Sequence, residues 1–411
     1  MVVNLIDLNK ANRIVPLFRL AFRSFFLGGA MFSLIALGLW GVFWMQGMDW
    51  NPYGGWIWWH SHEMLFGFVA AIIVGFLLTA VQNWTGIESI HSWPLAGLFT
   101  VWLLPRIFLL FPYEPIEPLL PWLDLVYLPL AAWVMGRMVW KVRQMRNLFF
   151  VPVLLLLAVI NAQMHWAVNH GDGVLAKEAA RSAIFVIVFV MTVLGGRVIP
   201  FFTANGTGTS KATPIVAVEI LSMGSVAVLA LLQLAGVLKL LPTLLVAVLF
   251  LLAGAVHLVR FLRWRPWITL KVPLLWSLHM AYLFIVLGFF LAAARYAGLS
   301  LDVFKSLGFQ YATILHSFTL GGMGLLIVGM MARVSLGHTG RPLAVSSWMS
   351  LAFLAVVLAY LCRVWLPLLV PDLSHYWSHV LSIVLWLLGY GLFVVIYLPI
   401  LSKPRVDGRP G

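Results

Sequence analysis

The stretch of sequence that decides the fold is residues 56–86, which read WIWWHSHEMLFGFVAAIIVGFLLTAVQNWTG. Its apolar part is as long as the roughly 20 residues that an α-helix needs to cross a lipid bilayer. His60, His62 and Glu63 open this part, and no other charged residue follows within the stretch. Ionisable groups are costly inside a membrane segment and by default indicate function there. The stretch therefore predicts a membrane-spanning helix that carries a functional site.

The composition of the whole chain also indicates a membrane protein. Of its 411 residues, 63% are hydrophobic and 9% are charged. The apolar runs are too long and too uniform for the alternating strands of a membrane barrel, which leaves helices as the structure that satisfies the backbone in lipid. A single cysteine, Cys362, excludes an internal disulfide and a cysteine-rich zinc or iron–sulfur site. The predicted fold class is an all-α polytopic membrane bundle.

Twelve membrane spans are predicted, in one transmembrane domain without a soluble module. The first is interpreted as a helix and not as a removed signal peptide, because no small-residue cleavage site follows it. The predicted spans are residues 22–45, 57–83, 94–111, 122–140, 149–169, 182–201, 214–238, 242–262, 272–295, 309–334, 344–368 and 376–400.

The basic residues predict the orientation. Of the 26 Lys and Arg residues, 19 fall at the two termini and in the loops that follow even-numbered spans. Such an excess marks the cytoplasmic side, so both termini are expected in the cytoplasm. The net charge of +13 then reflects topology beside anionic membrane lipids, and no nucleic-acid partner is expected.

With this orientation, most of the histidines collect in the outer half of the membrane. Five of them are candidate metal ligands there: His60, His62, His165, His170 and His316. His316 lies about 10 Å deep in its span at 1.5 Å per residue. Arg106 and Arg363 fall at a similar depth, and each would need an anionic partner there.

His60 and His62 either serve different partners or precede the start of the helix. They are two residues apart, so on a regular helix they point about 200° away from each other and cannot ligate one metal. His60 and Glu63 share one face at i, i+3, a spacing that suits a carboxylate holding the second ring nitrogen of a metal ligand. For His91, His375 and His379 the interpretation is instead hydrogen bonding at the membrane interface.

Three further features suit a cofactor or a polar path. His316 opens the run HSFTLGGMG at 316–324, whose glycines let a flat group or another helix approach the backbone. The fifth span carries a polar stripe with Asn161 and His165, and the ninth carries His279, nearer the inner side. Either stripe is typical of a hydrogen-bond network or of a proton or substrate path, and both histidines are candidate ligands.

A second set of polar residues lies at the inner ends of three spans. Asn83 ends the second span, Arg197 lies at the end of the sixth, and Arg333 and His338 end the tenth. The two arginines could clamp an anion such as a carboxylate or propionate by bidentate contacts. The alternative is that they are positive-inside anchors that cap helix carbonyls.

Three motifs, in order, make the chain resemble the NnrS family. They are WHSHEMLFG at 59–67 with GFLLTA at 75–80 and NWTG at 83–86; GRVIP at 196–200; and GMMAR at 329–333 with LGHTGRP at 336–342. The resemblance covers the whole chain. It implies a bacterial inner-membrane protein with haem and copper, associated with the response to nitric oxide and often encoded alongside denitrification functions.

The function expected from the resemblance is to bind or handle nitric oxide or a related gas, and so to contribute to resistance to nitrosative stress. The metal site is expected in the outer half, with Glu63 orienting an imidazole and Arg106 or Arg363 pairing with haem propionates. No Cys-x-x-Cys-His occurs, so any haem is non-covalent.

Whether the chain turns over a substrate as a redox metalloprotein stays open at this point. A redox enzyme would need an external electron donor as a partner, since no docking domain is visible. Two alternatives remain: a transporter that uses the polar stripes as a path, and a metal or cofactor delivery factor linked to denitrification.

Overall fold

The structure is a computed structural model of the chain, and it describes residues 12–298, 311–370 and 375–409. Twelve of the described helices are long and apolar enough to cross a membrane. Each coincides with one predicted span, which confirms the all-α polytopic fold. Contacts divide the chain into two compact units: unit 1 is Met1–Ala180, Met331–Leu343 and Tyr390–Gly411, and unit 2 is Arg181–Met330 and Ala344–Gly389.

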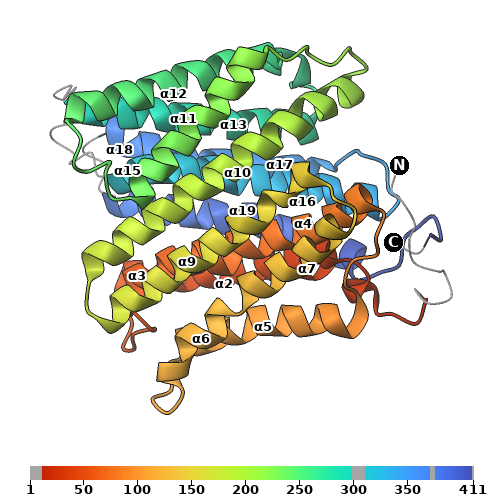
Figure 1. Cartoon of the computed structure of the whole chain (residues 1–411), viewed down its shortest axis with the longest axis horizontal. Coiled ribbons are helices and arrows are strands. Elements are labelled where there is room, and N and C mark those ends of the chain that lie inside the picture. The colour runs from red at the N-terminus through yellow and green to blue at the C-terminus, as the bar shows by residue number, and fades with distance from the viewer. Residues whose placement is uncertain (1–11, 299–310, 371–374, 410–411) are drawn as a thin grey trace. The chain divides into compact units, whose positions relative to one another are not determined.

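Unit 1 is built mainly from the first five spans (Figure 1). Its elements are η1 (Pro16–Phe18), α2 (Ala21–Gln46), α3 (Gly55–His62), η2 (Glu63–Val69), α4 (Ala70–Thr85), α5 (Ser92–Leu110), η3 (Glu117–Leu119), α6 (Leu120–Leu125), α7 (Tyr127–Lys141), α8 (Met145–Leu148) and α9 (Phe150–Asn169). α2 and α7 pack on α4, and α9 packs on α7. The fully buried rings of Phe22, Phe25 and Trp102 lie in this core.

Unit 2 is built mainly from the later spans. Its elements are α10 (Gly173–Thr207), α11 (Val216–Leu234), α12 (Thr243–Arg263), η4 (Pro266–Thr269), α13 (Pro273–Tyr296), α15 (Tyr311–His316), η5 (Ser317–Gly324), α16 (Leu325–His338), α17 (Ser347–Tyr360), η6 (Leu361–Trp365), α18 (Leu366–Leu369) and α19 (His375–Leu401). The start of α10 and the ends of α16 and α19 belong to unit 1. α12 packs between α11 and α13, and η5 packs on α13 and α17.

The sixth span differs most from its prediction. The apolar run predicts 182–201, whereas α10 spans Gly173–Thr207. The carboxylate of Asp172 accepts hydrogen bonds from the backbone N–H groups of Val174 and Leu175 at 3.1 and 2.9 Å, and so caps the first turn, which the charged Lys177 and Glu178 follow. Hydropathy indicates which part of a helix is apolar enough to lie within the bilayer. It does not indicate where the helix begins or ends. Residues 309–310 of the tenth predicted span lie outside the described residues.

Three of the described spans contain a stretch of π-helix: η2, η5 and η6. π-helical turns are rare and occur frequently at functional sites. η2 begins directly after His62, η5 directly after His316, and η6 contains Arg363. Each of these π-helices therefore lies at a residue that the sequence analysis selected.

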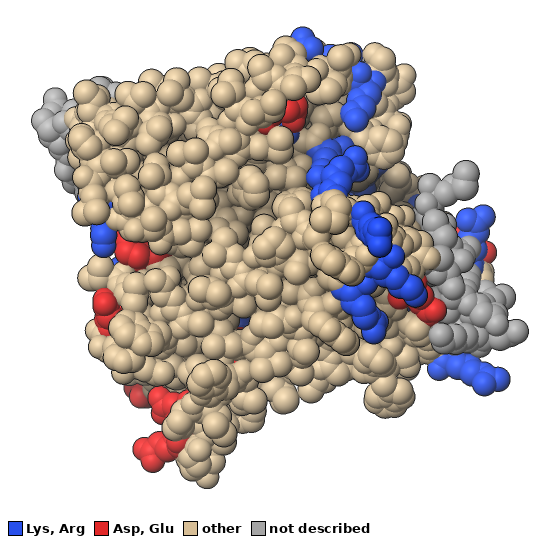
Figure 2. Space-filling view, in the orientation of Figure 1, with Lys and Arg blue, Asp and Glu red and all other residues tan. Residues whose placement is uncertain are grey.

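The surface charges of unit 1 are separated along its helices. Figure 2 shows Lys and Arg side chains at the end where α7 finishes, and Asp and Glu side chains mainly at the other end, near α6 and the turn between α9 and α10. In unit 2, Lys and Arg gather at the loops around 208–215 and 263–272.

Candidate metal centre

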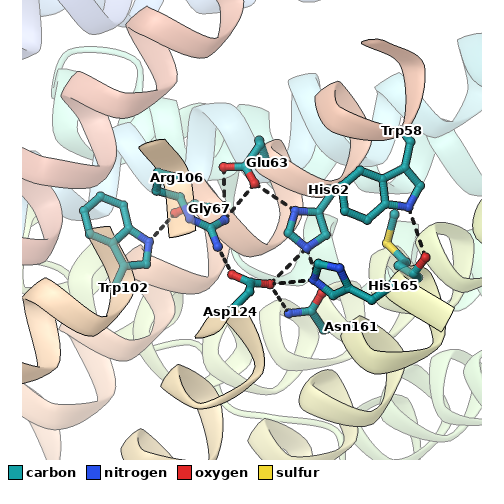
Figure 3. Close-up of polar contacts among 10 residues, drawn as sticks. Trp58, His62, Glu63, Gly67, Trp102, Arg106, Asp124, Asn161 and His165 are labelled. Carbon is teal, nitrogen blue, oxygen red and sulfur yellow. Dashed lines mark hydrogen bonds and ion pairs between the residues drawn. The ribbon is translucent and has the colours of Figure 1, made fainter. Parts of the chain in front are cut away.

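Three metal-ligating side chains meet in the interior of unit 1 (Figure 3). His62 ends α3, Asp124 lies in α6 and His165 lies in α9, and their ligand atoms all lie within 4.8 Å of one another. Oδ2 of Asp124 is 3.1 Å from Nε2 of His62 and 3.1 Å from Nε2 of His165. All three side chains are buried. Two imidazoles and one carboxylate that converge in this way form a donor set for copper or non-haem iron.

A further layer of polar side chains orients these groups. Oε1 of Glu63 lies 2.8 Å from Nδ1 of His62, and Oδ1 of Asn161 lies 2.7 Å from Nε2 of the same ring. The amide nitrogen of Asn161 donates to Oδ2 of Asp124 at 2.6 Å. An ionised carboxylate only accepts, so Nδ1 of His62 carries a proton. Nε2 therefore faces two acceptor oxygens and requires a cation between them, either a proton or a metal ion.

Arg106 finds its anionic partners within the protein. Nη1 donates to Glu63 at 2.9 and 3.0 Å, and Nη2 forms an ion pair with Oδ1 of Asp124. With both carboxylates ionised, this buried group of charges keeps one unbalanced negative charge. The guanidinium contacts that were expected to serve haem propionates are thus made to Glu63 and Asp124. One more positive charge at the histidines would balance the centre.

Aromatic rings and close backbone contacts enclose the centre. The ring of Trp58 stacks on that of His62 with centroids 4.4 Å apart, and its N–H donates to the carbonyl of Met164 at 3.2 Å. Trp102 donates to the carbonyl of Gly67 at 2.8 Å. A Cβ atom on Gly67 would lie 2.5 Å from the Phe32 ring and 2.7 Å from Oε2 of Glu63, so only glycine fits here.

Tyr53 lies at the edge of this site, in the loop before α3. Its ring is 5.6 Å from that of His165, and its hydroxyl donates to Oδ1 of Asn169 at 3.1 Å. Burial and the nearby Glu117 carboxylate raise the pKa of Tyr53 to about 12. The phenol therefore stays neutral and serves as a fixed hydrogen-bond donor.

Two of the six predicted metal-ligating histidines, His62 and His165, are brought together. The ring of His60 instead stacks on Trp40 with centroids 4.5 Å apart. His170 is exposed and its Nδ1 donates to the carbonyl of Trp166 at 2.8 Å.

The other two candidate histidines lie in unit 2. His316 donates from Nδ1 to the carbonyl of Ala312 at 2.6 Å, and Nε2 of His279 lies 2.9 Å from the hydroxyl of Thr203.

Of the predicted supporting residues, Glu63, Asn161 and Arg106 belong to the centre in unit 1, whereas Arg363 lies in η6 of unit 2. Arg363 is buried and has no ion-pair partner among the described residues. At the inner-side motif, Asn83, Arg333 and His338 fall in unit 1 and Arg197 in unit 2. The ring of His338 lies 5.4 Å from that of Phe22, and its carbonyl accepts from Arg405 at 2.8 Å.

The glycine run in η5 offers no surface to a haem. A Cβ atom on Gly321 would lie 2.6 Å from the Tyr360 ring, and one on Gly324 would lie 2.5 Å from the Trp386 ring. The space that the glycines leave is thus filled by aromatic side chains of α17 and α19. The contacts of this run therefore match the approach of another helix and not that of a flat group.

Asp124 was not among the predicted residues, and neither was a second polar network in unit 2, in which Arg260 and His257 are buried and Glu219 is 26% exposed. There Glu219 pairs with Arg260, whose Nη1 donates to the Tyr282 hydroxyl at 3.1 Å. Nδ1 of His257 lies 2.7 Å from the same hydroxyl, and its Nε2 donates to the Ser222 carbonyl at 3.0 Å. The signal in both cases was a lone carboxylate within an apolar span, which is costly without a partner.

Comparison with curated proteins finds no match. Comparison with protein families finds one that accounts for the motifs quoted above. The model of the family described as NnrS protein matches residues 16–405, nearly the whole chain, so the chain belongs to the NnrS family.

Proposed function

We propose that His62, Asp124 and His165 hold a metal ion, with copper as the first candidate, and that this centre binds nitric oxide or a related gas. The observation that carries the proposal is the convergence of three buried ligand atoms on one point, beside an arginine that is shared by two carboxylates. Isolated buried charge in a membrane is very costly, so a cation is expected to accompany it. A proton on His62 would supply the same charge, and a metal count distinguishes the two.

Each surrounding residue has a definite task in this proposal. Glu63 holds the Nδ1 proton of His62 and so presents Nε2 as the ligand atom. Arg106 fixes Asp124 through Oδ1 and leaves Oδ2 toward the histidines. The bound metal would supply a coordination position for the gas. We assign no haem ligands, because the glycine run that was expected to admit a haem is covered by side chains.

Membership of the NnrS family supports a part in the nitric-oxide response, and it does not favour a transporter or a delivery factor. An apolar gas partitions into lipid, so a centre buried among membrane helices meets it where it concentrates. We further propose a bacterial inner-membrane location with cytoplasmic termini. The gathering of Lys and Arg at one end of the unit 1 helices supports this orientation. An external electron donor is proposed only for turnover.

The test is a metal count on detergent-purified protein expressed with copper and iron supplied, followed by absorption spectra before and after nitric oxide. We expect stoichiometric metal, a spectrum that changes with the gas, and loss of the metal in Asp124→Asn. The matched control is Glu219→Gln, which makes the same change in the polar network of unit 2 and should keep the metal. Metal-free wild-type protein, or equal metal in Asp124→Asn and wild type, would overturn the proposal.

A further inference from the structure

A cavity of about 440 Å³ lies beside the candidate centre in unit 1. Its walls come from α3, α9 and the first turns of α10, and they are mostly apolar, with Ile57, Met164, Ala167 and Ala176 among them. Its polar side chains are Ser61 and, in or next to the first turn of α10, Asp172 and Lys177. The volume is far larger than a diatomic molecule and falls within the range of small-ligand pockets, about 300–1,000 Å³.

One side chain separates this cavity from the candidate ligands. Trp58 lines the cavity and also stacks on His62, with ring centroids 4.4 Å apart and planes within 11°. Its ring centroid is 5.3 Å from that of His165. Elsewhere around His62 lie Glu63 and Asn161, both held in hydrogen bonds, and the ring of Phe66, whose centroid is 5.3 Å from that of His62. Of these neighbours of His62, Trp58 is the one that also lines the cavity, so the direct route from the cavity to His62 passes the indole.

The indole is held at its edge and on one side. Its N–H donates to the carbonyl of Met164 at 3.2 Å. Gly54, at φ +73°, lies against the ring, and a Cβ atom there would be 2.7 Å from it. Glycine thus satisfies both the backbone conformation and the close approach at this position. The indole also contacts the rings of Tyr53 and His165, each at a centroid distance of 5.3 Å. It is uncharged, whereas Arg106 is held by ion pairs with two carboxylates.

We infer that this cavity is the access chamber of the metal centre for a small uncharged ligand, and that Trp58 controls the step from cavity to metal. The inference rests on the proposed function of the centre. An apolar wall favours an uncharged ligand, because a charged one would lose its hydration without new partners. A diatomic gas fits this description. A lipid chain could enter the cavity, but it could not pass the indole.

The first experiment measures the association rate of carbon monoxide and nitric oxide with the reduced, metal-loaded protein. Ala176→Trp fills the cavity and should lower the association rate by about tenfold, which corresponds to a barrier about 1.4 kcal/mol higher. Trp58→Ala should raise it. Val159→Trp is the control, because Val159 lies on α9 with 64% of its side chain exposed to the surroundings of the unit. Metal content and melting temperature are recorded for every variant.

A second readout does not need the metal. In a Cys362→Ser chain, Ser61→Cys places one thiol in the cavity wall, where a small neutral methanethiosulfonate should label it in metal-free protein. Ala176→Trp should slow the labelling and Val159→Trp should not. If Ala176→Trp does not fold, Ala176→Leu replaces it.

The outcomes separate the two proposals. Slowed labelling with an unchanged association rate would overturn the access route and leave the metal centre standing. Unslowed labelling in Ala176→Trp would overturn the cavity as a chamber. Wild-type protein without metal would overturn both the proposed function and the inference that rests on it.

Discussion

Each compact unit buries an arginine beside acidic and histidine side chains, but the two networks differ in what they leave open. In unit 1, Arg106 faces two carboxylates, and two histidines share one oxygen of Asp124. In unit 2, Arg260 faces the single carboxylate of Glu219.

His257, the histidine of the network in unit 2, has both ring nitrogens engaged. Nε2 of His257 donates to the Ser222 carbonyl, so its Nδ1 accepts the proton of the Tyr282 hydroxyl. The charges of Arg260 and Glu219 balance each other, and the lone pair of His257 accepts a hydrogen bond. This network therefore needs no further ligand. Buried ionisable groups in a membrane helix therefore indicate a ligand site only where acceptors converge without donors between them.

In both networks a helix glycine lies against the guanidinium of the buried arginine. A Cβ atom on Gly67 would lie 3.0 Å from Nη1 of Arg106, and one on Gly196 would collide with the guanidinium of Arg260. In both places the missing side chain makes room for the guanidinium. Since this arrangement occurs in both units, the packing of the arginine is enough to explain it.

The largest expected effect separates the histidines of the two networks. His165→Ala removes a ligand and should abolish stoichiometric metal, whereas His257→Ala should keep it. Both variants create a cavity and lose buried hydrogen bonds, so both should melt at a lower temperature. Metal content by elemental analysis, beside thermal melts, decides. Equal metal loss in the two variants would contradict the assignment of the metal to the network of unit 1 alone.

The next largest effect is expected at Glu63, the carboxylate that hydrogen-bonds the candidate ligand His62. Glu63→Gln should weaken metal affinity by about 10–100-fold, since an amide no longer fixes the tautomer of His62 as a carboxylate does. Glu88→Gln is the control, because Glu88 also contacts a histidine, His91, at 3.0 Å, but near the surface. Metal competition titrations measure the change. An unaltered affinity in Glu63→Gln would remove Glu63 from the centre.

A smaller effect tests the shared glycines. Gly67→Ala and Gly196→Ala should each lower the free energy of unfolding by about 1–3 kcal/mol, as overpacking does. Metal affinity should fall in Gly67→Ala alone. Chemical denaturation and metal titration on the same preparations check this. A stable Gly196→Ala protein would show that Arg260 can move without cost.

The smallest effect is at Tyr53, outside the membrane spans. Because its pKa is raised to about 12, its stabilising contribution is complete below the ordinary tyrosine pKa and is lost as the pH rises toward 12. Tyr53→Phe should remove this alkaline slope and cost about 0.5–1.5 kcal/mol at neutral pH from the lost hydrogen bond to Asn169. Tyr113→Phe, at a side chain that is 63% exposed, is the control. Denaturation curves between pH 8 and 12 should differ between the two variants in slope.

The fold was predictable from sequence because bilayer thickness fixes the length of each apolar run, and so the twelve spans could be counted. Within the centre, His62, Glu63, Arg106, Asn161 and His165 were selected, since ionisable and amide groups stand out against apolar neighbours. The sequence alone does not say which of them meet.

Which residues meet depends on the direction that each residue faces on its helix and on interruptions of the α-helix. Composition reveals neither of these. His60 and His62 differ only in the direction they face on α3. Asp124 was missed because it lies near the start of a predicted span, where a carboxylate reads as interfacial. The π-helix of η2 leaves no mark in the sequence, because its apolar residues suit an α-helix equally well.

The candidate ligands of the centre are residues 62, 124 and 165, whereas unit 1 is completed by segments that include 390–411. During synthesis the donor set is therefore complete once the fifth span has entered the membrane, long before the last helix of the same unit leaves the ribosome. Folding of membrane and soluble chains alike proceeds from the N-terminus as they emerge. This order lets the three donor side chains and the rings that enclose them meet before the last segments of the chain complete the unit.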